Sequence, residues 1–203
     1  MTDYYGIEIE TTSDVYEPSD DSKLMVEAVK KHAKGRMLDL GCGSGIVGIA
    51  ALKSNKVNSV LFADINPDAL IVADRNATNN CVQDKDVSFV ESDLFSVMKT
   101  NRFDTIAFNP PYLPTSEEEK IKGPINHAYD GGLDGRAVTD RFLAEFLPHM
   151  NPTGVLILLQ SSLSNTNKTI GILEKMGFQV HVEGSAKFFF EEISCLIATR
   201  ART

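Results

Sequence analysis

The 203-residue sequence has no tryptophan, three cysteines and no long hydrophobic run. Its longest apolar stretch, residues 155–159, is of strand length and far below the roughly 20 residues that a membrane span needs. The first ten residues lack the basic start and apolar core of a secretory signal. Cys42, Cys81 and Cys195 are scattered without C-x-x-C spacing, which is typical of reduced thiols and indicates no structural zinc site built on cysteines. We therefore expect a cytoplasmic protein without a membrane anchor.

The residue patterns of several common catalytic sites are also missing. The four histidines, His32, His127, His149 and His181, show no metal-ligand spacing, and we interpret them as surface or packing residues. There is no G-x-S-x-G motif and no Cys–His signature of covalent catalysis. We expect no metal at the site and no nucleophile of the hydrolase type.

Basic residues are in the minority. Twenty Lys and Arg stand against 28 Asp and Glu, so the net charge is −8. Such a surface repels phosphate backbones, which disfavours a nucleic-acid substrate unless a local basic patch exists. Hydrophobic residues make up 42% and charged residues 24%, as in an ordinary globular protein. The length fits one domain, residues 1–203.

Strand-like and helix-like segments alternate along most of the chain. The patterns predict strands over residues 36–40, 59–63, 87–90, 103–108, 153–160, 178–182 and 193–199, and helices over residues 45–54, 67–79, 138–147 and up to 176. Alternating βα units predict an α/β fold, a Rossmann-like doubly wound sheet of seven strands. The sheet should be mostly parallel, with an antiparallel strand from the C-terminal hairpin. We interpret residues 188–190, three phenylalanines, as hairpin packing.

The most informative stretch is Asn109-Pro110-Pro111-Tyr112, which follows the apolar strand over residues 103–108. The carboxyl ends of such strands are where open α/β sheets bind ligands. The Asn109 amide oxygen and the Pro110 carbonyl offer two acceptors, whose geometry the prolines restrain. Two acceptors beside the Tyr112 ring suit a planar NH₂ group. The loop that follows, residues 113–134, is unusually long, and we expect a lid over the site.

A glycine-rich loop, Asp39 to Gly45, lies between the first predicted strand and a helix. Gly41 and Gly43 fit a dinucleotide fingerprint, but Ile46 occupies its third glycine position. Asp39 would repel a pyrophosphate and suits a cationic ligand. S-adenosylmethionine carries an ammonium group and a sulfonium but no phosphate, so we expect it as the cofactor.

Polar residues also end the next two predicted strands. Asp64 stands where a carboxylate accepts ribose hydroxyls. Ser92, Asp93 and Leu94 offer an acceptor for the adenine amino group and an apolar contact for its ring. Each acid alone is typical of a helix cap or strand end. Together, after three successive strands, they predict a nucleoside site. The hypothesis is methyl transfer to a planar NH₂ nitrogen, with catalysis by positioning.

These motifs together resemble the class I S-adenosylmethionine-dependent methyltransferases of the HemK type. Residues 15–22 look like the family segment that closes over the cofactor, and we expect residues 1–30 to cover it. Residues 127–136 resemble the family's Gly-Gly loop. Because only 14 residues precede the segment over residues 15–22, the chain resembles the short archaeal and eukaryotic branch of the family. The resemblance implies cofactor binding by Ser22, Asp39, Gly41, Asp64, Asp93 and Leu94, and substrate binding by Asn109.

The branch methylates the glutamine amide of the Gly-Gly-Gln motif in class 1 translation release factors, leaving S-adenosylhomocysteine. The resemblance also implies a small zinc-ribbon activator protein, which pairs with the edge of the sheet. Residues 87–90 are the expected edge strand, unless a helix of the chain itself covers them. The alternatives are an adenine-N6 methyltransferase of DNA or RNA, a lysine methyltransferase, a cofactor-binding scaffold without catalysis and a nicotinamide oxidoreductase.

Overall fold

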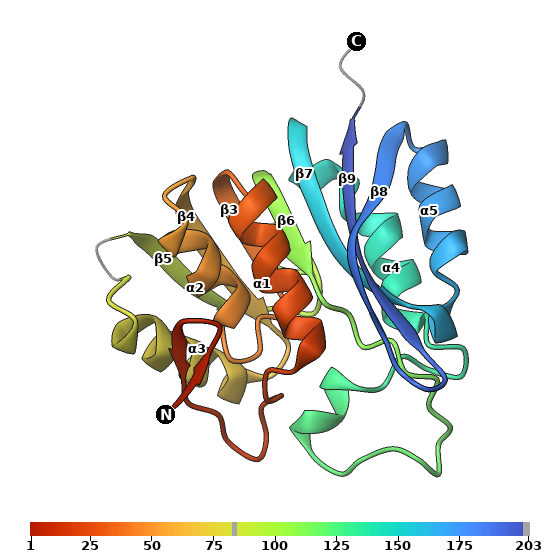
Figure 1. The fold of residues 1–203 in the computed structure, drawn as a ribbon, viewed down its shortest axis with the longest axis horizontal. Helices are drawn as coiled ribbons and strands as arrows, with labels where there is room; N and C mark the ends of the chain where they lie inside the picture. The colour runs from red at the N-terminus through yellow and green to blue at the C-terminus, as the bar shows by residue number, and fades with distance from the viewer. Residues whose placement is uncertain (83–84, 201–203) are drawn as a thin grey trace.

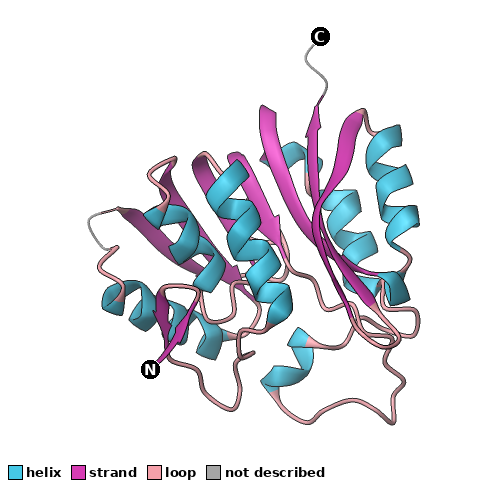
Figure 2. Cartoon of the chain, viewed as in Figure 1, coloured by secondary structure: helices cyan, strands magenta, loops and turns pink. Residues whose placement is uncertain are grey.

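A seven-stranded sheet forms the centre of the computed structural model, which describes residues 1–82 and 85–200 (Figures 1 and 2). The strand order is β5-β4-β3-β6-β7-β9-β8. The strands are β3 (Gly35–Leu40), β4 (Val57–Asp64), β5 (Asp86–Glu91), β6 (Phe103–Phe108), β7 (Met150–Ser161), β8 (Phe178–Lys187) and β9 (Glu192–Arg200). Strand β9 runs antiparallel to β7 and β8, and the other neighbouring pairs of this sheet are parallel. The predicted fold class is confirmed.

Helices cover both faces of this sheet. They are α1 (Asp20–His32), α2 (Ile46–Lys53), α3 (Pro67–Asn79), α4 (Ala137–Glu145) and α5 (Thr166–Lys175). Successive strand residues point to opposite faces, so Met37 belongs to the core under α1 to α3 and Leu38 to the core under α4 and α5. In Figure 1, α1 and α2 lie in front of the sheet. Three short 3₁₀ turns connect elements: η1 (Pro124–Ala128), η2 (Leu147–His149) and η3 (Ser162–Ser164).

The elements with the strongest local signals match the prediction best. Strand β6 and helix α3 have the predicted bounds. Helix α3 begins at Pro67, and the side chain of Asn66 caps it by accepting a hydrogen bond from the Asp68 N–H at 3.0 Å. Other elements differ by a few residues at their ends, most of all β8, which continues to Lys187.

The N-terminal segment contains elements that the pattern analysis did not predict. Strands β1 (Thr2–Tyr4) and β2 (Ile7–Ile9) form a small antiparallel hairpin. Ile7 and Ile9 are buried in the core shared with α1 to α3. Helix α1 begins after Ser19, whose N–H donates to the Ser22 hydroxyl, and it has Asp20 in its first turn and basic residues in its last. Within residues 1–30, residues from Asp14 onward line the cavity described below.

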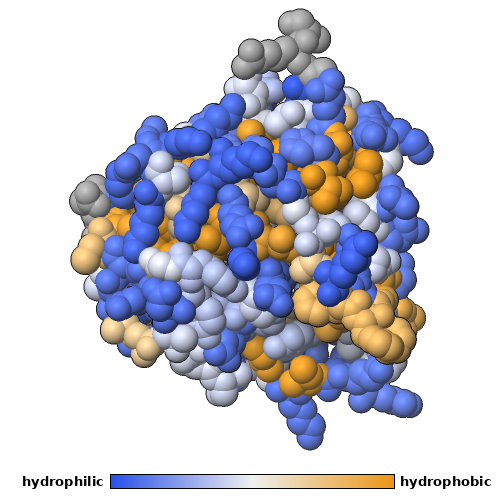
Figure 3. Space-filling view, viewed as in Figure 1, coloured by the Kyte–Doolittle hydropathy of each residue, from blue (hydrophilic) through white to orange (hydrophobic). Residues whose placement is uncertain are grey.

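The phenylalanine triplet does not pack inside the hairpin, so that interpretation is wrong. Phe189 is 93% exposed and Phe190 83% exposed at the tip between β8 and β9. The reason is length: both strands extend beyond the sheet core, and the tip projects from it. Figure 3 shows pale orange atoms over this hairpin at the lower right. In the described part of the chain no helix is both long and apolar enough to span a membrane.

Candidate active site

A cavity of about 680 Å³ lies at the carboxyl ends of the central strands. Every site residue predicted from the sequence lines it: Ser22, Asp39, Gly41, Gly43, Asp64, Ser92, Asp93, Leu94, Asn109, Pro110, Pro111 and Tyr112. Parallel neighbours β4, β3 and β6 end at the same edge of the sheet, which brings these separate motifs together. The cavity volume is in the range of small-molecule sites.

The glycine loop after β3 adopts a conformation that glycine permits. Gly41, Gly43 and Gly45 have φ of 62°, 51° and 80°. A Cβ on Gly45 would lie 3.0 Å from the Ala73 Cβ, whereas a Cβ on Gly43 would meet nothing within 4 Å. The middle of the loop is therefore open to a ligand, while its end packs closely on α3.

Two buried carboxylates brace this loop. Asp39 Oδ2 accepts from the Gly48 N–H at 2.8 Å, and Asp64 Oδ2 accepts from the Gly43 N–H at 2.9 Å. Burial raises the pKa of Asp39 to about 8, and the nearby charge of Asp64 adds to this, although the bond from Gly48 opposes it. Burial also raises the pKa of Asp64. Two close carboxylates with raised pKa values make this a place where a cationic group is favoured.

The segment over residues 92–94, which follows β5, is held in its conformation by a hydrogen bond between its own residues. The Ser92 hydroxyl donates to the Leu94 carbonyl at 2.7 Å, and Leu94 has a left-handed φ of 48° with a buried side chain. The Asp93 carboxylate accepts from Arg141 of α4 at 2.9 Å. Leu94 therefore contributes an apolar side chain to the cavity wall. Asp93 already has one partner, so an adenine amino group would share its carboxylate with Arg141.

Asn109 is held by a residue that the pattern analysis missed. Its Nδ2 donates to Asp21 Oδ2 at 2.9 Å. Asp21 is 2% exposed and also accepts from the Tyr16 hydroxyl at 3.1 Å. A carboxylate only accepts, so the amide of Asn109 must turn its NH₂ toward Asp21 and its oxygen away. Asn109 Oδ1 is buried and has no hydrogen-bond partner among the described residues, which is rare for an amide oxygen.

Close packing of the Gly135 backbone on the Tyr112 backbone fixes the end of the segment over residues 109–112. A Cβ on Gly135 would lie 2.3 Å from the Tyr112 carbonyl oxygen, and Gly135 has φ of 71°. The Gly131 N–H donates to the Leu113 carbonyl at 3.0 Å, which ties the two ends of the long loop together. Burial raises the pKa of the Tyr112 hydroxyl, and the charge of Asp21 adds to this. The phenol is therefore neutral at physiological pH.

Two segments far apart in the sequence form the roof of the cavity. One runs from Asp14 to Pro18, and the other includes Lys120 and η1. They meet where the Tyr16 and Tyr129 rings pack edge to face, with centroids 5.7 Å apart. Part of the loop over residues 113–134 therefore lines the cavity, and Figure 1 shows this loop in green below the sheet.

The lining is strongly acidic. Two cations, Lys120 and Arg141, stand against these seven carboxylates: Asp14, Asp21, Asp39, Asp64, Asp93, Asp130 and Glu191. Lys120 pairs with Glu117 and Asp130, and Arg141 pairs with Asp93. A pyrophosphate does not fit such a lining. A nucleoside with a sulfonium and an ammonium group does, because the open glycine loop accommodates it and the carboxylates match its charge.

Comparisons with known proteins agree with this geometry. Residues 14–189 match the model of the methyltransferase small domain family. A Methanocaldococcus jannaschii protein, provisionally named a protein N5-glutamine methyltransferase, is 42% identical over 96% of each chain. The eRF1 methyltransferase catalytic subunit mtq2 of Schizosaccharomyces pombe is 31% identical, over 90% of this chain and 88% of its own.

Among solved structures, the E. cuniculi Mtq2–Trm112 complex, whose title gives methylation of the eRF1 termination factor, contains a similar chain. It has a TM-score of 0.69 and 24% identity, over 93% of this chain and 99% of that one. That likeness supports the fold. The family match and the two relatives support more: the chain belongs to the methyltransferase small domain family and is an S-adenosylmethionine-dependent methyltransferase.

Proposed function

We propose that this enzyme methylates the glutamine side-chain amide in the Gly-Gly-Gln motif of a class 1 translation release factor. One observation carries the proposal: Asn109 Oδ1 is a buried acceptor that has no partner within the described part of the chain, at the wall of a cavity suited to the cofactor. A buried acceptor of this kind is costly unless a ligand satisfies it. A substrate N–H donor is the ligand that would do so.

A primary amide fits this wall because it has two N–H donors in one plane. Asn109 Oδ1 accepts one of them and the Pro110 carbonyl accepts the other. The Tyr112 ring, which stays neutral, packs on the face of the amide. When bound, S-adenosylmethionine supplies an electrophilic methyl group on its sulfonium. The chain contributes orientation, and well-placed reactants gain roughly 7–11 kcal/mol in this way.

We assign the cofactor to the glycine-loop half of the cavity. Asp39 faces the ammonium group, and the Asp64 carboxylate accepts from the ribose hydroxyls. Leu94 packs on the adenine, and Asp93 accepts from its amino group. Ser22, Gly41, Gly43 and Ser92 complete the wall, and the three acids stand at the ends of three strands or directly after them.

We further propose that residues 113–134 act as a lid and that residues 1–203 form one methyltransferase domain. The Tyr16–Tyr129 contact supports the lid, because it joins the loop to the N-terminal segment that forms the other part of the roof. The three cysteines are free thiols, which supports a reducing compartment such as the cytoplasm.

We propose a release factor as the substrate because of the names of similar proteins. The names of the fission yeast relative and of the E. cuniculi complex both refer to eRF1 methylation. A small partner protein, as in that complex, is proposed here along β5. This strand is at the edge of the sheet and pairs only with β4 among the described residues. A free strand edge favours pairing with another chain. The zinc-ribbon type of partner remains part of this proposal.

A lysine side chain is the second candidate, because the seven cavity carboxylates also suit an ammonium group. A transfer assay with labelled cofactor separates the candidates when it offers intact release factor, a Gln→Lys variant of its motif and DNA side by side. The proposal expects label in the glutamine substrate alone. Label only in the lysine variant or in DNA contradicts it.

Variants link that activity to the site. Asn109→Ala should abolish transfer while cofactor binding persists, since Asn109 holds the substrate amide. Asn79→Ala is the matched control, because Asn79 is exposed at the end of α3. To test the partner, the purified chain is assayed with and without a co-expressed small protein. Full activity alone, with no protein co-purifying, contradicts that part of the proposal.

A further inference from the structure

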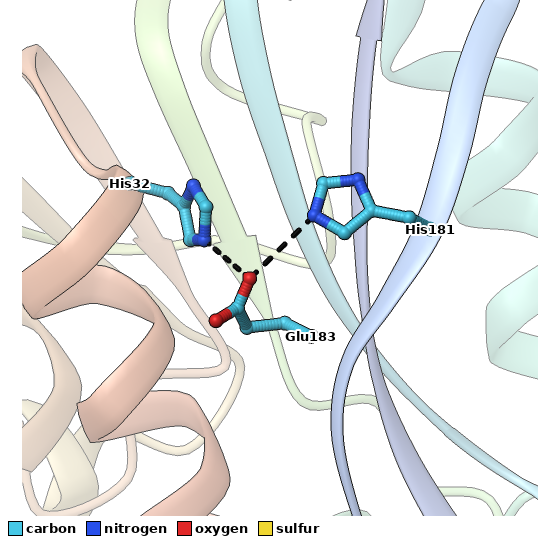
Figure 4. Close-up of side chains that lie close together, drawn as sticks. All are labelled: His32, His181 and Glu183. Atoms are coloured by element: carbon cyan, nitrogen blue, oxygen red, sulfur yellow. Dashed lines mark hydrogen bonds and ion pairs between the residues drawn. The ribbon is translucent and has the colours of Figure 1, made fainter.

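Three potential metal ligands that are far apart in the sequence meet on the surface of the sheet. His32 ends α1, whereas His181 and Glu183 belong to β8 (Figure 4). The ligand atoms of all three lie within 4.8 Å of one another. None of the three lines the methyl-transfer cavity. No regular spacing in the sequence reveals the cluster, and our interpretation of these histidines as surface or packing residues did not anticipate it.

The geometry directs both imidazoles at one oxygen. His32 Nε2 lies 2.6 Å from Glu183 Oε2, and His181 Nε2 lies 3.5 Å from the same oxygen. The two rings pack edge to face, with centroids 5.9 Å apart. Figure 4 shows the three side chains pointing toward one another across the gap between the helix and the strand.

The backbone holds this arrangement in place. The register between β8 and β9 shifts between Val182 and Gly184, so Glu183 lies in an irregularity of the strand. Next to it, helix α1 packs closely on β8, because a Cβ on Gly184 would lie 3.2 Å from the Leu24 side chain. The last turn of α1 lies against Glu183, because Lys31 and His32 both contact its carboxylate. The convergence follows from the packing of two rigid elements.

Glu183 is the one carboxylate among the three ligands, and it has a competing partner. The Lys31 ammonium forms an ion pair with it, so a metal ion and Lys31 would share Glu183. Lys31 contacts the other oxygen, Oε1, and its side chain is 64% exposed, so it can move into solvent.

We propose that His32, His181 and Glu183 form a three-ligand site for a divalent transition metal ion, with zinc as the best match. Two imidazoles and one carboxylate are a ligand set that zinc accepts, whereas magnesium and calcium prefer oxygen ligands alone. Zinc–ligand distances of about 2.0–2.2 Å place the donor atoms of a tetrahedral site about 3.4 Å apart. The measured separations of 2.6 and 3.5 Å bracket this value. Small side-chain rotations would admit the ion.

The exposure of His181, whose side chain is 57% accessible, leaves room for water at the fourth position. Such an ion joins the last turn of α1 to β8. The first turn of the same helix carries Asp21 and Ser22 at the catalytic cavity, about 16 Å away along the helix. The ion therefore anchors, at a distance, the helix that supplies part of the active site.

The test uses the full chain without an affinity tag, stripped with a chelator and then titrated with zinc sulfate by calorimetry. The expected result is one zinc ion per chain and a melting temperature raised by roughly 5–10 °C at a hundredfold excess over the dissociation constant. Cobalt should give the intense visible bands of a tetrahedral site. His181→Asn and Glu183→Gln should each weaken zinc binding at least tenfold.

Two controls separate a metal site from a simple ion pair. Lys31→Ala should tighten zinc binding, because it removes the ammonium that competes for Glu183. His127→Asn should leave zinc binding unchanged, because His127 lies at the other cavity. His181 is exposed, so its variant should fold, which circular dichroism checks. The proposal is overturned if no saturable binding occurs, or if His181→Asn and Glu183→Gln bind zinc as tightly as the wild type.

Discussion

Asp21→Asn is the substitution that most sharply probes how Asn109 is oriented. The Ser22 N–H and hydroxyl and the Ser19 hydroxyl all donate to Asp21 Oδ1, so the oxygen of the new amide must stay on that side. Its NH₂ group then takes the place of Oδ2 and faces Asn109 Nδ2, donor against donor. Asn109 relieves this by turning over, which points its NH₂ into the cavity and removes the acceptor for the substrate.

The size of the effect follows from the bond that is lost. A substrate N–H that is left without an acceptor in this buried site costs about 1–3 kcal/mol. Since about 1.4 kcal/mol corresponds to a tenfold change in rate, kcat should fall roughly 5- to 150-fold. Steady-state methyl transfer to release factor measures kcat, and calorimetry measures the cofactor dissociation constant separately. We expect the cofactor constant to change little, because the orientation of Asn109 acts on the substrate.

Asp20→Asn is the matched control. Asp20 is exposed in the same first turn of α1, so its variant changes the helix charge without touching Asn109. It should retain wild-type kcat. The reasoning fails if Asp21→Asn turns over at the wild-type rate, or if both variants lose the same activity.

Three further predictions test other parts of the site. Asp39→Asn should stabilise the cofactor-free protein increasingly as pH rises from about 4 to 8, by up to about 1.4 kcal/mol per pH unit. The reason is that the folded-state pKa of Asp39, about 8, exceeds the unfolded value of 3.8; a constant difference in thermal melts across this range contradicts it. Gly135→Ala should lower kcat more than tenfold and also lower stability, because its Cβ would meet the Tyr112 carbonyl; wild-type kinetics and melting would refute this contact. Phe189→Ser with Phe190→Ser should raise KM for intact release factor while leaving cofactor binding unchanged, since this exposed tip adjoins Glu191 of the cavity; an unchanged KM excludes the tip from docking.

Much of the catalytic wall could be predicted because its signals are local. Asn109 follows an apolar strand whose bounds the pattern fixes, and Asp64 ends another. In a parallel sheet, strand ends share one edge, so these residues meet regardless of helix details. That is why every predicted site residue lines the cavity.

What the prediction missed depends on contacts between distant segments. Asp21 and Asn109 are 88 residues apart in the sequence, and no motif beside either residue predicts the hydrogen bond between them. The His32–Glu183 pair spans 151 residues in the same way. Helix α1 could have been predicted from the sequence, because Ser19, two acidic residues in the first turn and a basic last turn are ordinary helix signals. The phenylalanine triplet was misinterpreted because strand length, and so the position of the hairpin tip, depends on pairing between β8 and β9.

Methyl transfer in this site requires that Asn109 Oδ1 and the Pro110 carbonyl hold the substrate amide in line with the methyl donor. Mass spectrometry of release factor treated with S-adenosylmethionine tests this most directly, with wild-type enzyme and Asn109→Ala compared side by side. We predict one added methyl group on the glutamine nitrogen of the Gly-Gly-Gln motif with wild-type enzyme, and none with Asn109→Ala, although the variant still binds cofactor. Methylation at the wild-type level by the variant, or methyl groups on other residues only, would contradict the account.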